Sequence, residues 1–228
     1  MLIIGPSTIA SGERKILMTE ILDLDKLRDT VVNTDYFPYC QVDCFIKKNN
    51  LFNVLQDFPN IDVRGSVPAS RLKFGTYFQQ LIDELHGEAL KQLIMEKFSI
   101  DLSQSHGMLT VRGQTTPRDG HIHVDTPSKL MTLLLYLNDN WCEKVGNLRL
   151  LKDNSSLEHY FDEVIPTAGK LLVFKVTDNC WHGHYPFVGD RKTIQFNYVT
   201  SEKVVAKEMQ KHSRSYTLKK VARVFKLG

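Results

Sequence analysis

The spacing of apolar positions along the chain changes from helical to strand-like near residue 100. Over residues 76–98 apolar side chains recur at i, i+3, i+4 and i+7, which predicts helix, with Thr76 as its N-cap. Upstream, Asp23 is expected to cap a short helix whose apolar face is formed by Leu24, Leu27 and Val31. Residues 64–68 are expected to form a loop.

From residue 108 to residue 199 the chain consists of short β-type runs separated by turns. Eight strands are expected, at 108–112, 120–125, 131–138, 147–151, 163–165, 170–175, 180–185 and 192–199. Runs of this length and spacing are typical of an antiparallel sandwich or jelly roll. The expected fold is therefore α+β in a single domain, 1–228. It comprises an N-terminal helical and strand support (1–105), a double-stranded β-helix core (106–200) and a C-terminal helix (201–228).

The composition is that of an ordinary globular protein, with 42% hydrophobic and 24% charged residues among 228. No apolar run approaches the roughly 20 residues that span a bilayer. The apolar N-terminus, 1–6, lacks the basic segment of a signal peptide, so we interpret it as a strand or arm. The four cysteines form no CxxC pair, which favours a reduced, cytoplasmic protein.

Positive charge is concentrated at the C-terminal end. Residues 201–228 carry eight Lys or Arg and two Glu, a net of +6, so with an overall charge of +3 the remainder carries −3. A body of net negative charge argues against nucleic acid as a partner. The tail is expected to form a basic amphipathic helix that packs on the domain or on a second copy in a homo-oligomer. The alternative is a peripheral contact with an anionic membrane. Its apolar face would be Leu218, Val221, Ala222 and Phe225.

The core contains the run His121-Ile122-His123-Val124-Asp125. Alternate residues of a strand point to one face, so its three polar side chains are expected to point the same way. Burying them without a partner would be costly, and a metal ion would supply one. A third ligand is available in Trp181-His182-Gly183-His184. Two His and one carboxylate that leave three coordination positions open are typical of non-haem Fe(II) oxygenases.

A second motif follows this histidine pair. Arg191 lies nine residues after His182, and Thr193 follows two residues later. On a strand Arg191 and Thr193 share a face, and an arginine fork beside a hydroxyl is a good receptor for a carboxylate. The pattern therefore indicates a dicarboxylate beside the metal.

Residues 121–199 resemble the catalytic core of the prolyl-hydroxylase-like branch of the Fe(II)- and 2-oxoglutarate-dependent oxygenases. Asn147 departs from that family, which usually has a second glycine at this position. The resemblance is carried by His123-Val124-Asp125, Thr132-x-x-x-Tyr136-Leu137-Asn138, Trp141, Gly146-x-Leu148-Arg149, the strand 169–174 and His182-x-x-x-Pro186-x-x-x-x-Arg191.

The resemblance implies Fe(II), 2-oxoglutarate and O₂ as cofactor and co-substrates. It implies hydroxylation of an unactivated C–H, coupled to conversion of 2-oxoglutarate to succinate and CO₂. The aspartate in the motif favours hydroxylation over halogenation. The residues implied to bind iron are His123, Asp125 and His182. Those implied to hold the C5 carboxylate of 2-oxoglutarate are Arg191, Tyr136 and Thr193.

His121 and His184 compete with the implied iron ligands. Only His123 lies two residues before the aspartate, and the family's spacing from His to Pro and Arg selects His182. His121 and His184 are therefore candidate substrate contacts, with hydrogen bonding inside the barrel as the alternative. Trp181 and Arg112 are further candidates for substrate contact.

The substrate class stays open between a peptidyl residue such as proline and a carbohydrate, including a lipid-linked glycan. Arg112, Arg118 and Lys129 are expected near the barrel mouth, and their convergence would imply an anionic substrate. Solvated charge at strand ends is the alternative interpretation. A different function is a non-catalytic jelly-roll protein that binds a metal or a sugar. Arg191 and Tyr136 argue against it, because such a protein needs no dicarboxylate anchor.

Overall fold

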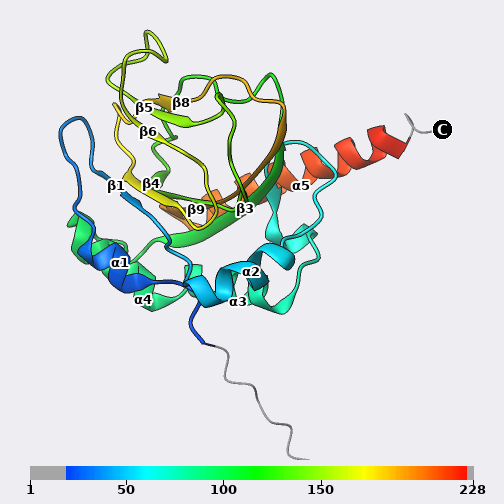
Figure 1. Cartoon of the computed structure of the whole chain (residues 1–228), viewed down its shortest axis with the longest axis horizontal. Helices are drawn as coiled ribbons and strands as arrows, with labels where there is room; N and C mark the ends of the chain where they lie inside the picture. Colours follow the sequence, from blue (N-terminus) through cyan, green and yellow to red (C-terminus); the bar gives the residue numbers. More distant parts are fainter. Residues whose placement is uncertain (1–18, 225–228) are drawn as a thin grey trace, which may run out of the picture.

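A computed structural model describes residues 19–224, in which a large and a small antiparallel sheet face each other (Figure 1). The large sheet has six strands in the order β1 (Tyr39–Val42), β7 (Leu171–Lys175), β4 (Lys129–Tyr136), β9 (Gly189–Val199), β3 (His106–Thr115) and β2 (Val67–Pro68). The small sheet has the order β6 (Tyr160–Val164), β5 (Leu148–Leu151) and β8 (His182–Gly183).

Alternation along the strands of the large sheet separates a helix-covered core from a cavity. On β4, Leu133 and Leu135 join the hydrophobic core beneath the sheet. Thr132, Leu134 and Tyr136 point to the opposite side and line a cavity between the two sheets. Because the side-chain period of a strand is two residues, the same strand serves both purposes.

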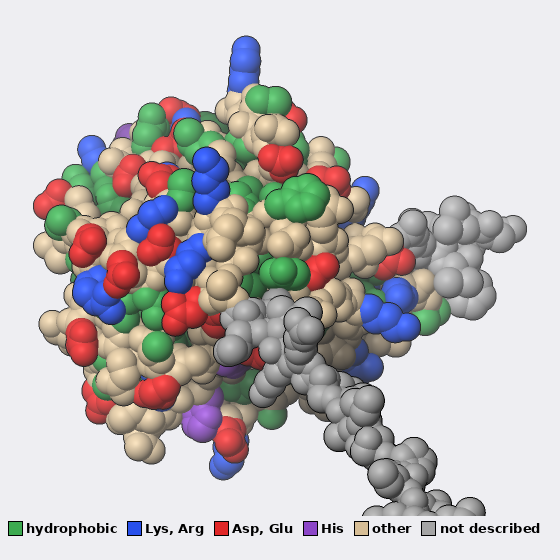
Figure 2. Space-filling model, turned by 60° about the horizontal axis from the view of Figure 1, so that its bottom comes forward, with side chains coloured by type: hydrophobic (Ala, Val, Ile, Leu, Met, Phe, Trp, Pro, Cys, Tyr) green, Lys and Arg blue, Asp and Glu red, His purple; other side chains and the backbone are tan. Residues whose placement is uncertain are grey.

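Four helices pack beneath the large sheet, on the side away from the small one (Figure 1). They are α1 (Leu24–Asp29), α2 (Lys48–Gln56), α3 (Thr76–Leu85) and α4 (Glu88–Phe98), with a 3-10 turn, η1, at Ala69–Arg71. Acidic and basic side chains are interspersed over the face shown in Figure 2, with hydrophobic ones scattered among them.

The helix expected at 76–98 is two helices that meet at Gly87. The prediction that Thr76 caps the first of them is wrong, because Thr76 is already helical and Gly75 is the N-cap. The carboxylate of Asp57 accepts a hydrogen bond of 2.7 Å from the N–H of Tyr77 instead. A cap supplied by a different helix leaves no local sequence signal.

The short helix after Asp23 is confirmed, since the Asp23 carboxylate accepts from the N–H of Lys26 and Leu27 is fully buried. Val31, expected on its apolar face, lies beyond the helix and is 84% exposed. The loop expected at 64–68 ends in strand β2.

The strand expected at 120–125 is wrong. That segment is irregular, and only His123 forms a bridge, to His182. The other seven expected runs each overlap a strand. Strands β1 and β2 come from the region expected only to support the core, so residues 19–105 contribute directly to the large sheet. The expected N-terminal arm at 1–6 lies outside the described residues.

The C-terminal helix is α5 (Glu202–Val224), which runs along the large sheet and then extends past it (Figure 1). Tyr216 packs against the hydrophobic core, whereas Leu218 is 71% and Val221 48% exposed. The expected packing of these two apolar residues on the domain is therefore wrong, and Phe225 lies outside the described residues. Within 19–224 no helix is long and apolar enough to cross a membrane. All four cysteines are free thiols.

Candidate metal and 2-oxoglutarate site

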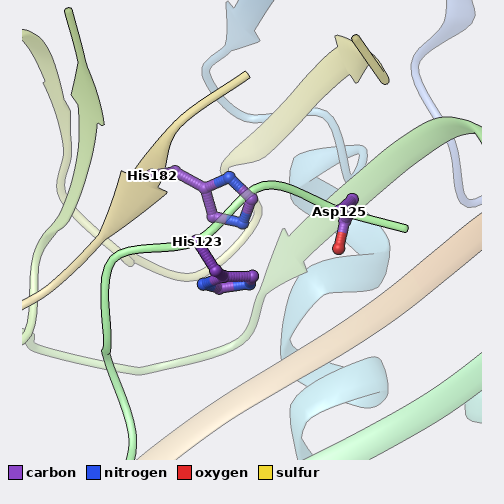
Figure 3. Close-up of side chains that lie close together, drawn as sticks. All are labelled: His123, Asp125 and His182. Atoms are coloured by element: carbon purple, nitrogen blue, oxygen red, sulfur yellow. The ribbon is translucent and has the colours of Figure 1, made fainter. Parts of the chain in front are cut away.

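His123, Asp125 and His182 come together at the wall of the cavity (Figure 3). One potential ligand atom from each lies within 4.8 Å of the others. Asp125 and His182 are buried, while His123 is exposed. Two imidazoles and one carboxylate at this separation can occupy one side of a metal ion and leave its other positions open.

The backbone aligns the two histidines. The N–H of each donates to the carbonyl of the other at 3.0 Å, and their ring centroids are 4.3 Å apart. The Nδ1 atoms of His123 and His182 each lie 2.8 Å from a backbone carbonyl oxygen, of His121 and Cys180. A carbonyl can only accept, so Nδ1 carries the proton and the lone pair on Nε2 is available to a metal. Burial lowers the pKa of His182 to about 4, which keeps this imidazole neutral.

Asp125 is held by two side chains. Lys129 Nζ lies 2.7 Å from one carboxylate oxygen, and the hydroxyl of Thr132 donates to the other. Asn197 donates in turn to the Thr132 hydroxyl at 2.7 Å. Burial alone would raise the pKa of the Asp125 carboxyl, but the charge of Lys129 and these hydrogen bonds hold it below its ordinary value. The carboxylate is therefore charged and oriented. The expected position of Lys129 at the mouth is wrong, since it pairs with Asp125 and is absent from the cavity lining.

Arg191, Tyr136 and Thr193 lie together and also line the cavity. The Arg191 guanidinium carbon lies 5.3 Å from the centroid of the Tyr136 ring, and all three residues are buried. Burial raises the pKa of Tyr136 and lowers that of Arg191. Each of these residues has one buried polar atom without a hydrogen-bond partner among residues 19–224: Arg191 Nη2, Tyr136 Oη and Thr193 Oγ1. Because leaving such atoms unsatisfied costs free energy, a bound carboxylate is the group that fits them.

Arg191 is fixed from behind by a residue that sequence reasoning did not assign to the site. Its Nε donates at 2.9 Å to the carbonyl of Gly146, whose φ of +89° suits glycine. Asn147, the departure from the family pattern, accepts from the Trp141 indole and donates to Glu163, both at 3.0 Å. The turn is thus held by the amide that replaces the expected glycine.

The cavity between the sheets has a volume of about 310 Å³. Four of the residues expected near the substrate line it: Arg112, Arg118, His121 and His184. Trp181 is not among the residues that line the cavity, and its expected contact with the substrate stays a prediction. Arg112 and Arg118 therefore both reach the cavity, but Arg112 pairs with Asp119 at 2.7 Å.

The family comparison agrees with this geometry. The model of the 2OG-Fe(II) oxygenase superfamily matches residues 104–199, a segment that contains the triad and Arg191. Among curated proteins no sequence matches the chain.

Solved structures share the fold at low identity. A prolyl 4-hydroxylase from Phytophthora capsici is 17% identical with a TM-score of 0.55, over 85% of this chain and 71% of that one. A prolyl hydroxylase from Trichoplax adhaerens, in complex with a hypoxia inducible factor peptide, is 20% identical with a TM-score of 0.54, over 80% and 92%. HygX from Streptomyces hygroscopicus, with nickel and 2-oxoglutarate bound, is 12% identical with a TM-score of 0.52, over 74% and 85%.

Residues 104–199 belong to the 2OG-Fe(II) oxygenase superfamily, and the chain has the fold of the prolyl hydroxylases, which confirms the resemblance inferred from sequence. Fe(II), 2-oxoglutarate and O₂, the expected cofactor and co-substrates, are those of the superfamily. The assignment of individual residues as ligands stays a prediction.

Proposed function

We propose that this protein is an Fe(II)- and 2-oxoglutarate-dependent dioxygenase that hydroxylates an unactivated C–H bond of its substrate. The observation that carries this proposal is the pairing of two half-sites in one cavity, a His-Asp-His cluster and three unsatisfied buried polar atoms. Bound iron with 2-oxoglutarate supplies the oxidising chemistry, with succinate and CO₂ as the other products. The two facing sheets around the cavity support a double-stranded β-helix as the catalytic core.

The chain itself positions the reactants. His123, Asp125 and His182 would hold the iron on one side, with their orientation set by the backbone carbonyls and by Lys129 and Thr132. The second half-site would anchor 2-oxoglutarate by its C5 carboxylate, through Arg191 together with Tyr136 and Thr193. Anchoring that end directs the opposite end of the molecule toward the triad.

The competing function is a non-catalytic jelly-roll protein that binds a metal or a sugar. The His-Asp-His cluster suits either function. A protein that binds only metal would leave Arg191 Nη2, Tyr136 Oη and Thr193 Oγ1 buried and unsatisfied, which is why we favour the oxygenase.

Anaerobic titration with Fe(II) and 2-oxoglutarate tests the proposal. A visible metal-to-ligand charge-transfer band should appear only when both are present, and admission of O₂ should yield succinate. The absence of the band, together with no succinate, would refute the oxygenase and favour the binding protein. The substrate is either a carbohydrate or a peptidyl residue such as proline. The residues that line the cavity help to choose between these two classes.

A further inference from the structure

The aliphatic and aromatic hydrocarbon side chains of the cavity wall gather beside the 2-oxoglutarate anchor. Its apolar and aromatic side chains are Leu134, Tyr136 and Leu148, and all three belong to the cluster packed around Tyr136. The rest of the lining consists of polar residues and glycines. A prolyl ring gains affinity mainly by covering its apolar surface, and beyond these three residues the lining of this cavity contains no further aliphatic side chain to cover it.

His184 is the buried titratable side chain of this wall that neither half-site uses. It is 5% exposed and lines the cavity, but it is not part of the metal cluster. Its Nδ1 lies 2.8 Å from the carbonyl oxygen of Tyr185. That oxygen can only accept, so Nδ1 is protonated and Nε2 carries a lone pair. Within residues 19–224 no group donates to that Nε2. His184 therefore presents a hydrogen-bond acceptor to the cavity.

The chain is built closely around His184. Its N–H donates to the Gly120 carbonyl at 2.9 Å. Gly120 has φ of +93°, and a Cβ there would lie 2.2 Å from the His184 carbonyl oxygen and 2.6 Å from Nδ1. Only glycine allows this approach, so the segment around Gly120 is shaped to hold the imidazole at the wall.

A donor and a further acceptor stand on the same wall. Arg112 donates to Asp119 at 2.7 Å, and the N–H of Thr116 donates to the other Asp119 oxygen at 2.7 Å. The guanidinium retains N–H groups beyond those it uses on Asp119 and Ser66, and the carboxylate retains lone pairs. Arg112, Asp119 and His184 therefore offer both donors and acceptors. A hydroxyl group donates and accepts at once and matches such a wall.

We propose that the substrate is a hydroxyl-rich molecule of the carbohydrate class, and that one of its hydroxyl groups donates to Nε2 of His184 while others pair with Arg112 and Asp119. This proposal rests on the proposed oxygenase function and selects between the two substrate classes left open above. His184 would be a substrate-binding residue that orients the sugar ring over the metal.

The tautomer of His184 tests the first step without any substrate. The full chain, labelled with ¹⁵N-histidine and loaded with Zn(II) and 2-oxoglutarate, should show a His184 imidazole protonated on Nδ1 and bare on Nε2. Its signals are assigned by their loss in His184→Gln. A proton on Nε2 would overturn the proposal, because His184 would then be a donor.

The second test compares two panels of probes on the Fe(II) enzyme, methyl glycosides (neutral, amino and uronic acid hexosides) and N-acetylated prolyl peptides. Glycosides should perturb the charge-transfer band and accelerate succinate release, and prolyl peptides should do neither. His184→Phe keeps the ring shape but lacks the lone pair. It should raise the glycoside concentration needed for half-maximal stimulation by roughly tenfold. His184→Gln should restore part of it. His159→Phe, at an exposed position outside the cavity, should match the wild type.

These experiments distinguish a failure of the carbohydrate proposal from a failure of the proposed oxygenase function. A missing charge-transfer band in the wild type, before any probe is added, would refute the oxygenase itself. A normal band with stimulation by prolyl peptides, or with no stimulation by any glycoside, would overturn the carbohydrate proposal and leave the oxygenase standing. The band in each variant shows whether the metal site is still assembled.

Discussion

His123 and His182 exchange two backbone hydrogen bonds, each of 3.0 Å, although 59 positions separate them in sequence. This bridge is the one ladder contact of the irregular segment that carries His123. Residues paired in this way project their side chains to the same side of the ladder. The bridge thus places both imidazoles on one face, and Asp125, two residues on, completes the cluster.

Substitution of His123 should abolish tight metal binding, while substitution of its neighbour should not. In His123→Ala the iron loses one of three protein ligands, so the Fe(II)-dependent band should be absent at metal concentrations that saturate the wild type. In His121→Ala the backbone carbonyl that accepts from His123 Nδ1 remains, and the titration should follow the wild type. The reverse order of effects would show that the spacing argument chose the wrong histidine.

The sequence predicted the residues that could bind the metal better than it predicted the side chains and segments that position them. The spacing of the family pattern selected His123 and His182, because the distances from His123 to Asp125 and from His182 to Pro186 and Arg191 can be read directly from the sequence. It misplaced Lys129, because nothing local tells whether a long side chain reaches outward or back to Asp125. The expected strand at 120–125 failed for a related reason: Gly120 is positioned by contact with His184, far along the chain. Strand β1 was missed because its four residues gain their structure from pairing with β7.

Replacement of Arg191 should weaken 2-oxoglutarate binding far more than iron binding. Arg191→Met removes the charge-assisted hydrogen bonds to the C5 carboxylate, which predicts a roughly 10- to 100-fold higher dissociation constant. Tyr136→Phe deletes one neutral donor and should cost less. Titration of the charge-transfer band with 2-oxoglutarate at saturating Fe(II) measures both. Lys192→Met is the matched control, because that side chain lies over Phe58 and outside the cavity. An equal rise of the 2-oxoglutarate dissociation constant in Arg191→Met and Lys192→Met would contradict the assignment of Arg191 as the carboxylate anchor.

Thr132 should act on the metal through Asp125. Thr132→Val removes the hydroxyl that orients the carboxylate and should weaken Fe(II) binding by ~10-fold, as for other partners of metal ligands. Thr132→Ser should restore most of the affinity. Anaerobic Fe(II) titration provides the measurement. Thr115→Val is a matched control, because the buried Thr115 hydroxyl has no hydrogen-bond partner in the described part of the chain and lies outside the cavity lining. Unchanged affinity in Thr132→Val would show that Lys129 alone suffices.

The Arg112–Asp119 pair should contribute stability that depends on pH. Burial alone would raise the pKa of Asp119, but Arg112 and the N–H of Thr116 hold it below the ordinary value of 3.8. In the unfolded chain Asp119 titrates at its ordinary pKa, so its contribution is complete above 3.8 and is lost as pH falls through the lower folded value.

Asp119→Asn should therefore lower the free energy of unfolding by ~1 kcal/mol near neutral pH. The difference in free energy of unfolding between this variant and the wild type should become smaller as pH falls below 3.8. Urea denaturation of the metal-free protein at several pH values measures it. Asp178→Asn, at an exposed position, is the control. A gap that stays constant or widens at low pH would show that the carboxylate is not stabilised in its charged form.

Helix α5 presents exposed apolar and basic side chains near its C-terminal end. Leu218 is 71% and Val221 48% exposed, and Arg214, Lys219 and Lys220 lie on the same stretch, where all three are exposed. Apolar residues flanked by cations suit an anionic membrane surface, to which each Lys or Arg contributes about 1 kcal/mol. We expect the full chain to sediment with vesicles containing phosphatidylglycerol, but not with pure phosphatidylcholine, and to be released by salt.

The double variant Leu218→Ser, Lys220→Glu should lose most of this binding. Lys152→Glu makes the same change of charge at an exposed position outside α5 and should retain it. Equal loss in both variants would indicate a response to overall charge alone. Absence of vesicle binding, with a dimer in solution that the double variant disrupts, would assign the exposed apolar residues of α5 to a contact between copies of the chain. That result would exclude a membrane as the partner of α5, because side chains buried between two copies cannot contact a membrane at the same time.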